Sequence, residues 1–253
     1  MLAHERREAI LERARVEPRV EVAAMAEEFD VTPETIRRDL SVLQRHGLVY
    51  RVHGGAIAVE KVGFEPSTED RRGRQAEEKA RMGKIAADLV PPFGTIAIDA
   101  GTSTLALATQ MPRDRELTVV TDSLQVAMQL ANIDSVTLFV VGGRTRPRTL
   151  ATVGPWAHRA FQEVRVDVAF MGTNGITVEA GLTTPDQAEA EVKRAMVRSA
   201  RRVVVLADHT KFGVEHFGRF ARLAEVDTVV SDADLDDEAV AAIEQAGPEV
   251  IRA

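Results

Sequence analysis

Short helical patterns occupy the beginning of the chain. Between residues 22 and 29 the apolar side chains recur at positions i, i+3, i+4 and i+7, which predicts one buried stripe on a helix. An earlier helix is predicted over residues 4–15. A third is predicted over residues 33–46, because Thr32 is a suitable N-cap and Pro33 suits the first helical position.

Apolar runs of three to six residues dominate the remainder of the chain. The predicted strands are Ile96–Asp99, Leu117–Val120, Val136–Val141, Val168–Met171, Val203–Leu206 and Thr228–Val230, with helical stretches between most of them. Strands buried on both faces that alternate with helices are typical of an open α/β domain with a mainly parallel sheet. Residues 59–75 contain glycine, proline and many charges without periodicity, which predicts a linker. We therefore expect two domains, over residues 1–58 and 76–253.

The first domain has the element order of a winged helix-turn-helix. Two helices are joined by a tight turn, and residues 48–55 form an extended hairpin arm that ends in two glycines. In the third helix the buried stripe is Ile36, Leu40 and Leu43. The opposite face carries four side chains suited to DNA, namely Arg37, Arg38, Ser41 and Arg45. A solvated helix face is the alternative for an isolated Arg-Arg pair, but the order of the elements favours a recognition helix.

Further candidate DNA contacts flank that helix. They are Thr32 and Thr35 at its start, and Arg51 and His53 on the arm. His53 can equally be a packed turn residue. Asp39 is expected to be a structural salt-bridge partner rather than a base reader.

Composition restricts the remaining function classes. The chain has 253 residues and no cysteine, which excludes disulfides, thiolate metal sites and thiol nucleophiles. No apolar run approaches the ~20 residues that span a bilayer, and the charged start lacks a signal-peptide core, so we expect a cytoplasmic protein without membrane contact. The net charge of −7 argues against a protein that binds nucleic acid. However, Thr32–Ala58 alone carries four arginines against two acidic residues, so the positive charge is local.

The strongest local motif in the second domain is Asp99-Ala100-Gly101-Thr102-Ser103-Thr104. It follows a predicted strand and opens a helix, where backbone N–H groups and hydroxyls can hold a phosphate or carboxylate. An ordinary N-capped turn between strand and helix is the alternative. Parallel strands end at one edge of the sheet, so we expect other strand-end residues to share this site, namely Asp122, Ser123, Gly143, Arg144, Asn174 and Lys211. For Lys211 the alternative is a surface lysine.

Motifs throughout the chain resemble the DeoR family of bacterial transcription regulators. They include Thr35–Leu40, Gly47–Ala56, Glu78-Lys79, Asp99–Thr104, Gly142–Arg144, Gly172–Ile176, Gly181–Pro185 and Lys211–Gly213. The resemblance implies operator DNA as a partner, a phosphorylated sugar or sugar-like effector, a homo-oligomer (dimer or tetramer), and repression of carbohydrate-metabolism genes.

Family sensors also resemble the ribose-5-phosphate isomerase fold, which makes Glu189, Glu191 or Lys193 a possible sugar-hydroxyl ligand. A solvated i,i+4 pair between Glu189 and Lys193 is the favoured alternative. The isomerase family has catalytic acidic residues where this chain has Thr173 and Asn174, which cannot serve as general acids or bases near neutral pH. A sugar-phosphate isomerase is therefore the second hypothesis, and a DNA-binding protein without a ligand is the third.

Other catalytic and metal signatures are lacking in the sequence. There is no G-x-S-x-G elbow or H-E-x-x-H helix, and the spacing of His209 and His216 is not a recognised metal pattern. We expect no cofactor and no metal. Trp156 is expected to fill the core or an interface.

Overall fold

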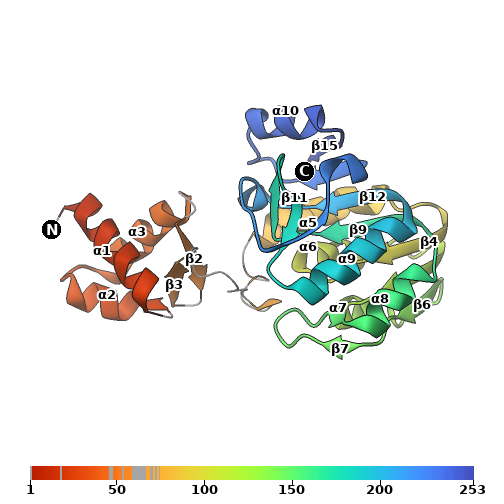
Figure 1. Cartoon of the computed structure of the whole chain (residues 1–253), viewed down its shortest axis with the longest axis horizontal. Coiled ribbons are helices and arrows are strands. Elements are labelled where there is room, and N and C mark those ends of the chain that lie inside the picture. The colour runs from red at the N-terminus through yellow and green to blue at the C-terminus, as the bar shows by residue number, and fades with distance from the viewer. Residues whose placement is uncertain are drawn as a thin grey trace. The chain divides into compact units, whose positions relative to one another are not determined.

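A computed structural model describes residues 2–17, 19–45, 48–52, 54–58, 67, 68, 71, 73 and 75–253. The chain divides into two compact units, residues 1–66 and 67–253 (Figure 1). His46, Gly47 and His53 lie outside the described residues.

The first unit contains the three predicted helices and the hairpin arm. Its elements are α1 (Ala3–Val16), β1 (Val20–Glu21), α2 (Val22–Glu28), α3 (Pro33–Arg45), β2 (Val49–Val52) and β3 (Gly55–Ala58). The strands form an antiparallel sheet in the order β1-β3-β2. Buried Ile10, Met25, Ile36 and Leu40 bring all three helices into one core. The predicted helix-turn-helix with its β arm is therefore confirmed.

Two polar contacts define how α3 starts and how it is held. The N–H of Thr35 donates to Thr32 Oγ1 at 3.3 Å, so Thr32 caps the helix as predicted. Asp39, on the buried side of α3, accepts from Arg6 Nε at 2.5 Å and from Arg7 Nε at 3.0 Å. Both arginines lie on α1, so Asp39 is the structural salt-bridge partner that the sequence indicates.

A seven-stranded parallel sheet forms the centre of the second unit. Its strand order is β15 (Glu249–Arg252), β14 (Thr228–Ser231), β12 (Ala200–Leu206), β9 (Val166–Gly172), β4 (Phe93–Ile98), β5 (Glu116–Thr121) and β6 (Val136–Val140). From β4 the chain proceeds outward to β5 and β6, and then returns to β9 on the other side of β4. The order therefore reverses between β4 and β9, which is where open α/β sheets present a ligand crevice.

Helices cover both faces of this sheet, so the unit has three layers (Figure 1). One face packs against α5 (Ala76–Asp88), α6 (Thr102–Thr109) and α7 (Leu124–Leu130). The other packs against α8 (Pro155–Gln162), α9 (Gln187–Ser199) and α10 (Asp237–Gln245). Because both faces are covered, the strands read as continuous apolar runs in the sequence.

Several short strands were not predicted. They are β7 (Arg144–Thr145) paired with β8 (Thr152–Val153), and the antiparallel set β10 (Gly175–Thr177), β11 (Gly181–Thr184) and β13 (Gly218–Ala221). Trp156 on α8 is 79% exposed, so it does not fill the core, and its alternative place in an interface stays a prediction. Among the helices of the described residues, none has the length and apolar character needed to span a bilayer.

Candidate functional site

A pocket lies at the carboxyl ends of β4 and β9, where the strand order reverses. It comprises about 400 Å³ of space, much of which is open to solvent. Six of the predicted effector residues line it: Gly101, Thr102, Ser103, Asn174, Lys193 and Lys211. The pocket thus brings together residues that follow three strands and one that lies on α9.

The amino end of α6 supplies one wall of this pocket. Gly101 precedes the helix, and Thr102 and Ser103 are its first two residues. The first N–H groups of a helix lack intrahelical acceptors and carry partial positive charge. Thr104 is different, because its buried hydroxyl donates to the carbonyl of Gly101 at 3.1 Å. Thr104 therefore shapes the turn, while Thr102 and Ser103 remain at the pocket.

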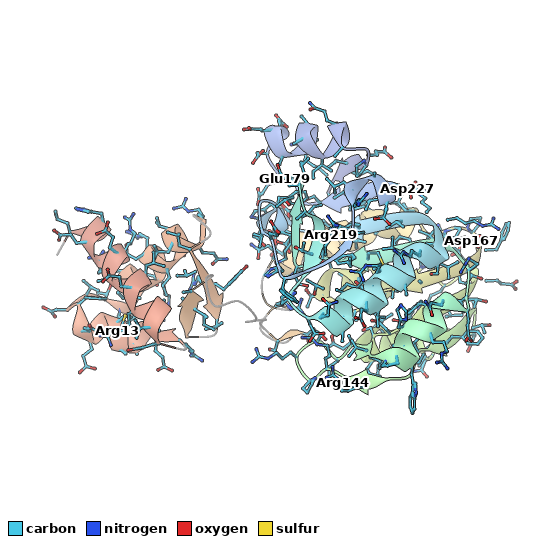
Figure 2. All side chains as sticks on the ribbon, in the orientation of Figure 1. Arg13, Arg144, Asp167, Glu179, Arg219 and Asp227 are labelled. Atoms are coloured by element: carbon cyan, nitrogen blue, oxygen red, sulfur yellow. The ribbon has the colours of Figure 1, made fainter. Side chains whose placement is uncertain are left out.

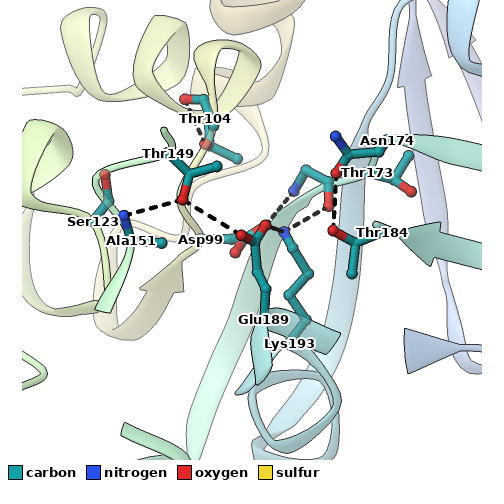
Figure 3. A network of polar contacts seen from close by, with 12 residues as sticks. Asp99, Thr104, Ser123, Thr149, Ala151, Thr173, Asn174, Thr184, Glu189 and Lys193 are labelled. Carbon is teal, nitrogen blue, oxygen red and sulfur yellow. Dashed lines mark hydrogen bonds and ion pairs between the residues drawn. The ribbon is translucent and has the colours of Figure 1, made fainter. Parts of the chain in front are cut away.

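A buried charge network forms the floor of the pocket (Figure 3). Lys193 Nζ donates to the carboxylate of Asp99 and, at 3.2 Å, to the carbonyl of Gly172. It lies 3.8 Å from Glu189, which also accepts from Arg146. Lys193 is 1% exposed and Glu189 is 3% exposed. The expected solvated pair on this helix is therefore wrong, because α9 turns both residues toward the end of β4; only Glu191 faces solvent.

Burial and the neighbouring charges shift the pKa values in this network. Burial alone would lower the pKa of Lys193, but the carboxylates of Asp99 and Glu189 outweigh it and the pKa is raised. Burial raises the pKa of Asp99, and the ammonium of Lys193 offsets part of that effect. Burial and the nearby Asp99 raise the pKa of Asp122 well above its ordinary value. Lys193 therefore remains charged, and the carboxyl of Asp122 keeps its proton to a higher pH than an ordinary aspartate does.

Lys211 lies at the rim, beside a second carboxylate. Its Nζ is 3.9 Å from Asp208, which also lines the pocket. Burial acts to raise the pKa of Asp208, but Lys211 and the hydroxyl of Thr210 lower it overall. Burial and Lys211 also lower the pKa of nearby His216 to about 4, so this imidazole is neutral near pH 7.

Besides Thr104, five predicted effector residues lie away from the pocket surface. Asp99, Asp122 and Ser123 are fully buried, and Ser123 caps α7 by accepting from the N–H of Val126 at 3.2 Å. Gly143 packs against the β8 backbone, and Arg144 projects from exposed β7 (Figure 2). Asp99 acts through Lys193. The other four do not line the pocket as expected, because the sequence shows a strand end but not the depth of the side chain that follows it.

Seven pocket residues were not among the residues predicted to contact the effector, although Glu189 was one of three alternatives for a sugar-hydroxyl ligand: Arg71, Lys79, Ala100, Gly172, Thr173, Glu189 and Asp208. Arg71 falls in the expected linker, where lack of periodicity concealed it. Lys79 is 6% exposed, although lysine is rarely buried. The burial of Glu189 could have been predicted, because it lies seven residues before Met196 and therefore on the same buried face of the helix.

The exposed face of α3 carries the predicted DNA contacts. Arg37 and Arg38 are exposed, and Arg37 pairs with Glu34 at 3.1 Å in an exposed contact. Ser41 donates to the carbonyl of Arg37 at 2.7 Å and accepts from Arg51 Nη1 at 3.0 Å. Arg51 lies on β2, so the arm and the helix present one polar surface. Arg45 is also exposed, near the end of α3.

His209 has a structural role that its spacing in the sequence does not reveal. Its Nδ1 lies 2.8 Å from Asp232, and Asp234 is close to both. Both oxygens of Asp232 accept backbone N–H groups, from His209 at 2.8 Å and from Asp234 at 3.0 Å. These hydrogen bonds explain why His209, Asp232 and Asp234 lie close together: they stabilise a turn.

Comparison with known families matches both units. The DeoR-like helix-turn-helix domain matches residues 6–62, and the DeoR C terminal sensor domain matches residues 74–233. The HTH-type transcriptional regulator GlpR of Haloferax volcanii is 36% identical over 99% of this chain and 98% of its own length. The glycerol-3-phosphate regulon repressor of Escherichia coli K12 is 32% identical over 90% of each chain.

Solved structures show more distant similarity. A probable sor operon regulator from Shigella flexneri covers 81% of this chain and 97% of its own, with 11% identity and a TM-score of 0.46. Ribose 5-phosphate isomerase A from Methanocaldococcus jannaschii covers 55% of each chain, with 16% identity and a TM-score of 0.41. The matches to both domains and the full-length relatives show that this chain belongs to the DeoR family, whose members are DNA-binding transcriptional regulators and not enzymes.

Proposed function

We propose that this regulator represses carbohydrate-metabolism genes and that a phosphorylated sugar in the β4–β9 pocket modulates its operator binding. The observation that carries the proposal is the meeting of the α6 amino end with Lys211 and Lys193 around one open pocket. A phosphate group would occupy the α6 end beside Lys211, and Asn174 and Glu189 would bond sugar hydroxyls. The name of the E. coli repressor, which refers to glycerol 3-phosphate, supports this ligand class.

The recognition surface is α3 together with the arm. Arg37, Arg38 and Arg45 would contact base edges and phosphates, and Thr32 and Thr35 would contact phosphates at the helix start. Arg51, already bonded to Ser41, would extend the surface along β2. A DNA contact by His53, on the arm, stays a prediction.

A dimer or tetramer in the cytoplasm is part of the proposal. Paired helix-turn-helix units read repeated half-sites. Edge strand β6 leaves Phe139 56% exposed and Val140 48% exposed, which suits contact with another copy of the chain. Light scattering of the purified protein would give the oligomeric state, and a monomer at micromolar concentration would contradict this part.

The decisive experiment is a mobility-shift assay on DNA from the protein's own upstream region. Glycerol 3-phosphate, ribose 5-phosphate and glucose 6-phosphate are added in turn, with inorganic phosphate and the unphosphorylated compounds as controls. We expect one phosphate ester to change operator affinity, and Lys211→Ala to abolish that response while it preserves operator binding. If no ester binds by calorimetry or alters the shift, the ligand-free alternative holds. Turnover of an ester would support the isomerase instead.

A further inference from the structure

The outward face of α3 carries one acidic side chain among its basic ones. Of the two acidic residues of this helix, Asp39 is buried and ion-paired, so Glu34 alone faces outward. The Glu34 side chain is 73% exposed, and it lies on the same stripe as Arg37 and Ser41, which follow it by three and seven residues. Phosphates repel a carboxylate, so its place on a DNA-binding face requires a reason.

Glu34 is bonded to the arginine of its own stripe. Arg37 Nη1 donates to Glu34 Oε2 at 3.1 Å. An ion pair this exposed contributes little to the stability of a fold. The start of the helix already has its cap, because the N–H of Thr35 donates to Thr32 Oγ1. The pair therefore holds a carboxylate and a guanidinium side by side in the first two turns of α3, without being needed to build them.

These first turns are the part of a recognition helix that reaches base edges in the major groove. We propose that Glu34 is a specificity-determining residue, whose carboxylate accepts a hydrogen bond from the N4 amino group of a cytosine next to a guanine that Arg37 reads. The inference rests on the proposed recognition surface, and it adds to that surface the identity of one operator base.

The major groove presents groups that a carboxylate distinguishes. Cytosine offers an amino donor there, whereas guanine and thymine offer acceptors, which repel a carboxylate. Adenine offers a donor beside an acceptor and suits a carboxylate less well than cytosine does. Arginine has several N–H donors, so Arg37 can keep its bond to Glu34 while other donors of its fork bond O6 and N7 of a guanine. The pair thus matches a cytosine beside a guanine.

Glu34 supplies discrimination rather than affinity. A negative charge that faces phosphates weakens the sequence-independent part of binding. At a wrong base the carboxylate also meets an acceptor, which weakens that site further. Arg38 and Arg45, exposed cations of the same helix, attract any DNA instead. Removal of Glu34 and removal of one of these arginines should therefore have opposite effects on binding to unselected DNA.

The test uses the full-length protein and a pool of random duplex DNA. The site that the wild type selects is remade with each base pair replaced in turn, and fluorescence anisotropy at fixed salt measures each affinity. We expect one position where loss of a cytosine weakens wild-type binding about ten-fold. Glu34→Ala should discriminate less than about two-fold at that position, keep the other preferences and bind unselected DNA more tightly. Glu34→Gln should shift the preference there toward adenine, because an amide can bond both N6 and N7 of that base.

A matched control separates this inference from the proposed function. Glu12→Ala removes the same charge from an exposed position of α1 and should keep every base preference. If the wild type selects a site but Glu34→Ala keeps all its preferences, or weakens every site equally, this inference is wrong and the proposed function stands. The inference is equally wrong if the position that Glu34→Ala relaxes does not hold a cytosine. If the wild type selects no sequence, both the inference and the proposed recognition surface are wrong.

Discussion

Lys193 on α9 donates a hydrogen bond to Asp99 at the end of β4, a residue 94 positions earlier in the chain. The contact crosses the point where the strand order reverses, so it joins the two halves of the sheet directly beneath the pocket. Both side chains are almost fully buried. Lys193 also holds the carbonyl of Gly172 at the end of β9. One ammonium group thus fixes the two strand ends that define the pocket.

Replacing that ammonium should destabilise the sensor. Lys193→Met removes the charge but keeps much of the volume, and it leaves Asp99 and Glu189 buried without their cation. We expect a loss of about 3–5 kcal/mol in the free energy of unfolding, measured by urea denaturation with circular dichroism. Lys84→Met, at an exposed position of α5, is the control and should change it by less than about 0.5 kcal/mol. Equal stability of the two variants would contradict the structural role of Lys193.

Asp122 should make the sensor less stable as the pH rises. Both of its carboxyl oxygens are buried and have no hydrogen-bond partner among the described residues, and burial raises its pKa. A raised folded-state pKa contributes stability at low pH that is lost as the pH rises through it. Asp122→Asn removes this titration, so the variant should gain stability relative to the wild type as the pH rises above the ordinary carboxyl value of 3.8. Exposed Asp114→Asn should show no such trend.

His216 should act in the opposite direction. Its pKa is lowered to about 4 by burial and by Lys211, against an ordinary value of 6.5. A lowered histidine pKa means that the unfolded chain takes up the proton first, so stability falls as the pH drops from about 6.5 toward 4. His216→Gln should remove up to roughly 3 kcal/mol of that acid sensitivity. Denaturation at several pH values measures it, with exposed His4→Gln as the control; identical pH profiles for wild type and His216→Gln would refute the assignment.

Gly83 should resist replacement although it lies inside a helix. Alanine normally stabilises a helix by about 1 kcal/mol relative to glycine. A Cβ on Gly83 of α5 would lie 2.7 Å from the carbonyl of Ala106 on α6, so the two helices would have to separate. We expect Gly83→Ala to lower the melting temperature, with a loss of about 1–3 kcal/mol. Gly142→Ala, where a Cβ meets nothing within 4 Å, should be tolerated.

Arg37 and Arg38 should be needed for operator binding. Each is exposed on α3, away from the buried stripe. Replacement of either by alanine should reduce operator affinity by about 1–3 kcal/mol if it contacts a base, measured by fluorescence anisotropy at fixed salt. Arg165→Ala, on the sensor surface, should bind normally. Normal binding by both the Arg37 and the Arg38 variants would remove α3 from the recognition surface.

The sequence predicts the elements well where burial is periodic or continuous. The stripe at Val22, Met25 and Ala26 lies on α2, and the apolar runs at 168–171 and 203–206 lie in β9 and β12. Strand β15 at the sheet edge is only partly buried and carries Glu249 and Arg252, so its pattern is weak. The two- to four-residue strands of the small sheets give too short a pattern to detect.

The pocket was harder to predict than the fold. The residues around Gly101 and Lys211 could be predicted, because they follow predicted strands and parallel strands end at one edge of the sheet. Lys193 and Glu189 look like an ordinary surface pair at i,i+4 spacing, and only the tertiary packing of α9 buries them. Arg71 depends on the docking of Thr68 onto the carbonyl of Arg148, a backbone contact that no side-chain pattern encodes.

The separation between Asp99 and Lys193 also sets an order during synthesis on the ribosome. Among the described residues of the first unit, every strand pairing lies within residues 20–58, so that unit can fold while the sensor is still being translated. Strand β4 emerges early, but its neighbour β9 and the cation for Asp99 are made much later. A nascent chain can therefore complete its helix-turn-helix unit before its pocket exists. A chain stalled before residue 193 would therefore carry a folded helix-turn-helix unit without a complete pocket.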